Sequence, residues 1–173
     1  MRPIRLSLQA FGPFATTEVV DFRSALETGL FGIYGQTGAG KSTLFSAMSF
    51  ALFGTPTKTD QEPRSLRSDH SSPDLPTEVE FVFELGSKTY LIRRRPVQER
   101  PKARGEGTTE DAAEASLFDA TGIPVEALGP SQPGRVIAEK KVSVVGQQVE
   151  ALLGYGADQF RQIVLLPQGK FET

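Results

Sequence analysis

The sequence has no cysteine and only one histidine among its 173 residues. Without cysteine there is no disulfide framework and no cysteine-ligated zinc site. The sequence also lacks a continuous apolar stretch of about 18 residues, the length that a membrane-spanning helix needs. Its N-terminus alternates polar and apolar residues, whereas a signal peptide has an unbroken apolar block. We therefore expect a soluble, cytoplasmic protein with no membrane partner.

Neither sign of charge is in excess, because 19 basic residues nearly balance 21 acidic ones. The overall charge gives no reason to expect a nucleic acid or an anionic membrane as partner, so any basic surface must be local. With 173 residues, 38% of them hydrophobic, the chain is long enough for one compact domain and short for two. A single α/β core is expected.

Hydrophobic periodicity predicts the elements of the first half of the chain. Alternating apolar residues indicate two antiparallel hairpins, one over residues 4–22 and one over residues 79–92. Between them, residues 29–34 are apolar and aromatic, which is typical of a buried strand. This strand leads into a glycine-rich turn and then into residues 41–53, whose apolar spacing is helical. The order strand, loop, helix is therefore predicted.

Less regular segments separate the remaining elements. Residues 55–76 are rich in Ser, Asp and Pro and predict an irregular connection. Residues 96–115 are rich in Pro, Gly and charge, so we expect an exposed insertion there, open to disorder. The other predicted elements are a short hairpin over 117–125, a helix over 141–153, a short helix around 158–161 and a buried strand over 163–166.

A phosphate-binding motif, G-x-x-x-x-G-K-[ST], begins at Gly35, after the predicted strand and before the predicted helix. Glycines let successive backbone N–H groups point inward, and these donors join the positive end of the helix in binding the oxygens of a triphosphate. Lys41 supplies a positive charge for the β- and γ-phosphates, and the Ser42 hydroxyl takes one place in the octahedral shell of Mg²⁺. The predicted nucleotide-binding residues are Gly35, Gln36, Thr37, Gly38, Ala39, Gly40, Lys41, Ser42 and Thr43.

The motif alone leaves the class of P-loop protein open. Residues 57–60 have the Thr-Lys-Thr-Asp spelling of a guanine-reading motif, but they follow the P-loop helix at once, without an apolar strand before them. A complete small kinase or GTPase also needs an acidic residue at the end of an apolar strand to hold Mg²⁺. Glu84 and Asp119 have such neighbours, yet both are explained more simply as turn-proximal residues of half-exposed strands.

Gln168 stands directly after the predicted strand over residues 163–166. Its amide oxygen suits a hard cation, so Ser42 and Gln168 are the candidate Mg²⁺ ligands. Taken alone, this glutamine is better explained as an exposed loop residue. No catalytic residue is evident beyond Lys41 and Gln168.

Five segments together resemble the N-terminal half of the ATPase head in the SbcC family, whose members are SMC-like ABC ATPases. They are the opening segment over residues 8–14, the P-loop over residues 35–43 and the segments over residues 66–70, 77–81 and 162–169. Similarity covers almost the whole chain, with residues 96–115 the least recognisable. The resemblance implies a P-loop NTPase of the α/β class, namely an ABC/SMC-like head lobe I with an antiparallel β-subdomain packed beside a mixed sheet and the P-loop helix.

The resemblance also implies how such a half-head works. Residues 1–173 would form one N-terminal half-head that binds ATP and Mg²⁺, with Gln168 as the Q-loop glutamine. A coiled coil and a C-terminal half-head, absent from this sequence, would supply the Walker B aspartate, the catalytic glutamate and the signature motif. Related heads often carry an arginine at the position of Gly12, so that nucleotide contact is not carried over.

The partners implied are the C-terminal half-head, a second head in an ATP-dependent homodimer, an SbcD-type nuclease and double-stranded DNA ends, which would place the protein on the nucleoid. The chain alone is then expected to hydrolyse little or no ATP. Two alternatives stay open: an SMC-type DNA-tethering head without a nuclease, and a complete small P-loop kinase or GTPase.

Arg93, Arg94 and Arg95 form a local run of positive charge that is a candidate for contact with the DNA backbone. The favoured interpretation is nevertheless an ordinary solvated strand face.

Overall fold

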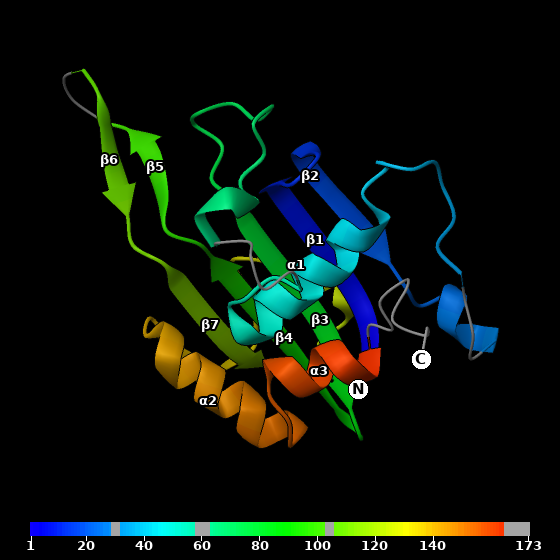
Figure 1. The fold of residues 1–173 in the computed structure, drawn as a ribbon. Coiled ribbons are helices and arrows are strands. Elements are labelled where there is room, and N and C mark those ends of the chain that lie inside the picture. Colours follow the sequence, from blue (N-terminus) through cyan, green and yellow to red (C-terminus); the bar gives the residue numbers. More distant parts are fainter. Residues whose placement is uncertain (29–31, 58–62, 103–105, 165–173) are drawn as a thin grey trace.

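The computed structural model describes residues 1–28, 32–57, 63–102 and 106–164. Six strands form one sheet in the order β2-β1-β3-β4-β7-β8, and every pairing between them is antiparallel. Three helices lie on one face of this sheet (Figure 1). The sheet strands are β1 (Arg2–Phe11), β2 (Phe14–Asp21), β3 (Glu78–Leu85), β4 (Lys88–Arg95), β7 (Glu114–Asp119) and β8 (Arg135–Glu139). The helices are α1 (Lys41–Phe53), α2 (Val142–Leu153) and α3 (Ala157–Val164).

Both long hairpins predicted from the sequence are confirmed. β1 pairs with β2, and β3 pairs with β4 around the turn at Gly86. The main core lies between these strands and the helices, where Leu6, Phe81, Phe83 and Ile92 are fully buried. Burial of apolar surface stabilises the fold by roughly 25 cal/mol per Å², so this layer holds the helices on the sheet.

Helix α1 begins and ends at the residues that its periodicity predicts. Eight of its 13 residues are buried, from Leu44 to Leu52. A helix that is apolar on most sides belongs in the interior. It ends at Gly54, which has a left-handed φ of 78° and donates its N–H to the carbonyl of Phe50 at 2.8 Å. The interior therefore fixes the helix that carries the phosphate-binding motif at its start.

The predicted hairpin over residues 117–125 is wrong, because β7 pairs with β8 instead. Prolines at 124, 130 and 133 lack the N–H that a ladder needs. Ile123, Val125 and Leu128 pack into a second core on the other face of the sheet, against Val82 and Leu91. The segment between the strands thus covers a sheet face and adds no strand to it.

The predicted insertion over residues 96–115 contains regular structure. β5 (Gln98–Pro101) pairs with β6 (Thr108–Asp111), and Ala115 is a buried residue of β7. The side chain of Gln98 anchors the hairpin: its Oε1 accepts the N–H of Thr77 at 2.6 Å, and its Nε2 donates to the carbonyl of Thr77 at 3.2 Å. A side-chain amide can replace a strand neighbour in this way, which residue composition does not reveal.

Two predicted buried strands are also corrected. Residues 32–34 are not in a strand, and Tyr34 is 93% exposed. Residues 163 and 164 end helix α3, while residues 29–31, 165 and 166 lie outside the described part. A short apolar run does not by itself distinguish a strand from a buried helix. The described strands show no parallel pairing, so the parallel part of the expected mixed sheet is not found among them.

Short 3-10 helices complete the described chain at Ala25–Thr28, Pro63–Leu66 and Val125–Ala127. Within the described ranges, no helix has the length and apolar character to cross a membrane.

Candidate functional site

The glycine-rich motif forms an exposed loop that leads directly into the buried helix α1. Gly38 and Gly40 have left-handed φ values of 86° and 83°, which side chains other than glycine rarely adopt. No side chain caps the start of α1. The first N–H groups of a helix lack intrahelical partners, and together with the helix dipole they form a site for anions.

Lys41 closes this loop through its side chain. Its Nζ donates to the carbonyl of Gly35 at 2.7 Å and to the carbonyl of Gln36 at 2.6 Å. The loop is also held by a bond from the N–H of Ala39 to the carbonyl of Gln36 at 3.2 Å. The ammonium group therefore lies at the loop itself, where an entering phosphate would compete with the two carbonyls for its protons.

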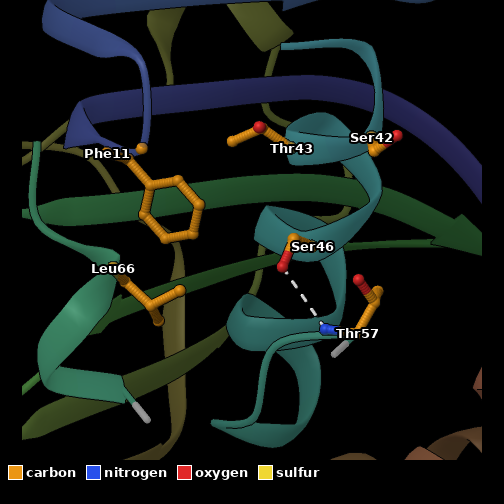
Figure 2. Close-up of a pocket in the computed structure, with 7 residues that line it drawn as sticks. Phe11, Ser42, Thr43, Ser46, Thr57 and Leu66 are labelled. Carbon is orange, nitrogen blue, oxygen red and sulfur yellow. Dashed lines mark hydrogen bonds between the residues drawn. The ribbon is translucent and has the colours of Figure 1, made fainter. Parts of the chain in front are cut away.

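The hydroxyl groups at the start of α1 point in different directions. Figure 2 shows Thr43 pointing toward Phe11 and Ser42 pointing the opposite way. Ser42 is exposed, as expected of a residue that meets a ligand in solution. A pocket of about 170 Å³ lies beside this end of the helix, and it is lined by Phe11, Gly12, Ser42, Thr43, Ser46, Thr57 and Leu66. The lining therefore combines the apolar side chains of Phe11 and Leu66 with four residues that carry hydroxyl groups.

A hydrogen bond joins α1 to the chain that follows it, at the pocket residues Ser46 and Thr57. The N–H of Thr57 donates to Oγ of Ser46 at 3.3 Å (Figure 2). This bond fixes the chain shortly after α1, at residues that were interpreted from sequence as part of an irregular connection. Ser46 and Thr57 were not predicted as site residues, because neither belongs to the phosphate-binding motif.

The described residues supply groups for the phosphates and one of the two candidate ligands for Mg²⁺. A Cβ added to Gly38 would meet no atom within 4 Å, so the space in front of the loop is open. Backbone donors, one lysine and one serine hydroxyl are the groups that bind phosphate and a first coordination position of Mg²⁺. Gln168, the second candidate ligand, lies outside the described residues. The described residues contain no group of three or more His, Asp or Glu side chains that could hold a metal ion.

Arg94 is not available for DNA, which corrects the prediction for this residue. Its side chain is 2% exposed. Nε donates to the carbonyl of Ala51 at 3.0 Å and Nη2 donates to that of Leu52 at 3.2 Å, so the guanidinium binds the C-terminal end of α1. Burial lowers the pKa of Arg94 to about 10. Its role is inside the fold.

Arg93 and Arg95 point to the opposite face of the sheet and are paired with carboxylates. Nη2 of Arg93 lies 2.7 Å from Oε2 of Glu80, and Nε of Arg95 lies 2.6 Å from Oε2 of Glu78. Glu80 also pairs with Arg5 at 3.0 Å. Arg93 and Arg95 are therefore each paired with a carboxylate, and their contact with DNA stays a prediction.

Glu84 and Asp119 both lie near hairpin ends, as the simpler interpretation expects. Glu84 pairs with Arg2 at 3.2 Å. Asp119 accepts hydrogen bonds from the backbone N–H of Thr121 and from Arg135. The pKa of Asp119 is lowered to about 2, first by side-chain hydrogen bonding with Thr121, then by the backbone N–H of Thr121 and by Arg135. These partners account for both carboxylates without a metal.

Comparison with known proteins identifies relatives over nearly the whole chain. The model of the AAA domain matches residues 5–173. The SbcC subunit of the SbcCD nuclease from Vibrio cholerae is 42% identical over 171 residues, which are 99% of this chain and 16% of that protein. Its counterpart in Lactococcus lactis is 41% identical over the same shares, and that of Staphylococcus aureus is 36% identical over 172 residues. The chain thus spans about one sixth of the length of these curated relatives.

Proposed function

Because the chain belongs to the AAA domain family and its relatives are the SbcC subunits of SbcCD nucleases, we propose that it is the ATP-binding segment of an SbcC-type ATPase. The observation that carries this proposal is the glycine loop that opens the buried helix α1, with Nζ of Lys41 against its carbonyls. Such a loop offers backbone donors and the positive charge of Lys41 to a triphosphate.

On binding, Lys41 would exchange the carbonyls of Gly35 and Gln36 for the β- and γ-phosphate oxygens of ATP. The Ser42 hydroxyl, and Gln168 as a second oxygen donor, would hold Mg²⁺. When held there, Mg²⁺ would supply positive charge that offsets the negative charge of the phosphates. The chain's own residues grip and orient the nucleotide, and we infer that the groups that activate water come from the rest of the full-length protein.

For the full-length protein, we propose an ATP-driven head that dimerises around ATP and controls an SbcD-type nuclease at DNA ends. The names of the relatives support a two-subunit nuclease complex. A DNA-tethering head without a nuclease is distinguished by co-purification, because an SbcC-type protein should capture a metallo-nuclease and a tethering head should not.

Titration with ATP tests the binding site directly. In the purified protein, Lys41→Ala should weaken the binding of Mg²⁺-ATP by about 100-fold, since it removes a charge-assisted contact worth roughly 3 kcal/mol. Ser42→Ala should weaken binding when Mg²⁺ is present and leave binding in excess chelator unchanged. Lys88→Ala is the matched control and should bind as the native protein does, because Lys88 is an exposed lysine at the start of β4.

Two results would contradict the proposal. One is a native protein that does not bind ATP, or an Lys41→Ala variant with native affinity. The other is ATP turnover of about 1 per second or more by the 173-residue chain alone, a rate typical of complete enzymes.

A further inference from the structure

The turn between β1 and β2 lies directly against the last glycine of the phosphate loop. A Cβ added to Gly40 would lie 2.7 Å from Cζ of Phe14 and 3.1 Å from Cγ of Pro13. Real Cβ atoms essentially never approach other atoms within 3.0 Å. Glycine is therefore required at position 40 for two reasons. Its φ of 83° is left-handed, and the ring of Phe14 leaves no room for a Cβ.

A second contact joins the same turn to the first turn of α1. Gly12 has a left-handed φ of 56°, and a Cβ there would lie 2.9 Å from Cγ2 of Thr43. The turn thus touches the nucleotide-binding segment on both sides of Lys41, at Gly40 and at Thr43.

The β1–β2 turn is also hydrogen-bonded to the segment around residues 66–68, which follows α1 in the chain. The N–H of Gly12 donates to the carbonyl of Leu66 at 2.8 Å, and the N–H of Ser68 donates to the carbonyl of Ala10 at 2.9 Å. Figure 2 shows Phe11 and Leu66 on one side of the pocket, opposite Thr43 on α1. With these two bonds, the turn is not free to swing away from the loop.

We propose that Phe14 is a positioning residue for nucleotide binding, and that Gly12 permits the close packing of its turn on α1. The ring of Phe14 supports Gly40, so the backbone donors next to Lys41 are held in place before the phosphates arrive. Preorganised donors bind more tightly because ordering them costs nothing on binding. This inference rests on the proposed function, since it names the residues that shape the same site.

Phe14→Ala tests the proposal through the affinity for Mg²⁺-ATP. We expect binding to weaken about 10-fold, which corresponds to the loss of one charge-assisted hydrogen bond between a backbone donor of the loop and a phosphate oxygen. The matched control is Val20→Ala, because Val20 lies on the same strand, is also half-buried against the main core, and stands roughly 20 Å along the strand from Phe14. Val20→Ala should lower the melting temperature and leave ATP affinity unchanged.

A double-mutant cycle with Gly40→Ala separates positioning from general destabilisation. The added Cβ meets the ring of Phe14 in the native protein, but this contact is absent when residue 14 is alanine. Gly40→Ala should therefore weaken ATP binding at least about 3-fold more in the native protein than in the Phe14→Ala background. If Phe14→Ala does not fold, Phe14→Leu replaces it, because leucine keeps the apolar volume and lacks the ring edge that reaches Gly40.

The outcomes are distinguishable. A native protein that does not bind ATP refutes the proposed function itself. If the native protein binds ATP, three results would each overturn the positioning role and leave the proposed function standing. They are native ATP affinity in the Phe14 variant, an equal loss of affinity in Val20→Ala, and additive effects of the two substitutions in the cycle.

Discussion

Replacing the buried arginine of β4 tests how the P-loop helix is attached to the sheet. Arg94 binds the carbonyls of Ala51 and Leu52 at the end of α1, and its Nη1 has no hydrogen-bond partner among the described residues. A Cβ added to Gly54 would lie 2.9 Å from this Nη1. The guanidinium therefore stabilises the helix end at the cost of its own burial.

Two opposing contributions decide the effect of Arg94 on stability: the cost of burying its charge and the gain from its hydrogen bonds. A pKa lowered to about 10 by burial corresponds to roughly 3 kcal/mol of lost hydration for the charged form of Arg94. Each hydrogen bond from a charged group contributes about 1.5–3 kcal/mol. Arg94→Met loses both bonds but also removes the buried charge, so we expect a net loss of about 1–2 kcal/mol in the free energy of unfolding.

Arg94→Lys should be the more damaging change, with a loss of about 3 kcal/mol. Lysine keeps the charge, is more strongly hydrated than arginine, and cannot donate in a fork to two carbonyls. Urea unfolding of the three proteins at neutral pH measures the order. If the lysine variant were more stable than the methionine variant, the charge at position 94 would have to be favourable in itself, and the reasoning from burial would be refuted.

Two further predictions concern other parts of the fold. Phe160→Ala should cost about 3–5 kcal/mol in the free energy of unfolding, because the ring is fully buried with its centroid 5.4 Å from that of Phe53. Gln162→Ala, at an exposed position of the same helix, is the control. A loss below about 1 kcal/mol for Phe160→Ala would show that α3 is not packed on α1. For Asp119, whose folded pKa of about 2 is below the ordinary value near 4, the ionised carboxylate stabilises the fold at neutral pH, and this contribution is lost as pH falls from about 4 to about 2. Asp119→Asn should therefore flatten the acid side of a plot of melting temperature against pH, and an unchanged acid side would contradict the assignment.

The sequence predicts well those elements whose signals are local. The bounds of α1 follow from its position between the phosphate-binding loop and Gly54, and both long hairpins follow from strict alternation of apolar residues. Helix α2 starts at Val142, within one residue of its prediction, and Val145 and Val149 on it are buried.

The failures occur where a segment's neighbours decide its structure. Residues 32–34 have the apolar character of a strand, but they are not part of either described sheet. Apolar residues after β7 suggest a return strand, but prolines prevent the ladder and the side chains fill the second core instead. The anchoring of β5 by Gln98 depends on Thr77, which lies 21 residues away. None of these partners can be identified from periodicity.

For the candidate site too, the sequence predicts the local motif but not the distant residues that contact it. The motif identifies the nine residues from Gly35 to Thr43, but it does not reveal what holds them. Helix α1 is fixed at its start by the β1–β2 turn and at its end by Arg94 of β4, so both attachments come from the one antiparallel sheet. The two ends are roughly 20 Å apart, given 13 residues in the helix. Substitutions at Arg94 should therefore change the stability of the fold with little effect on ATP affinity, whereas those at Phe14 should change ATP affinity more than their effect on stability explains. The contacts of the β1–β2 turn with Gly40 and Thr43 thus join the C-terminal end of the phosphate loop to the sheet, while the space in front of Gly38 is open.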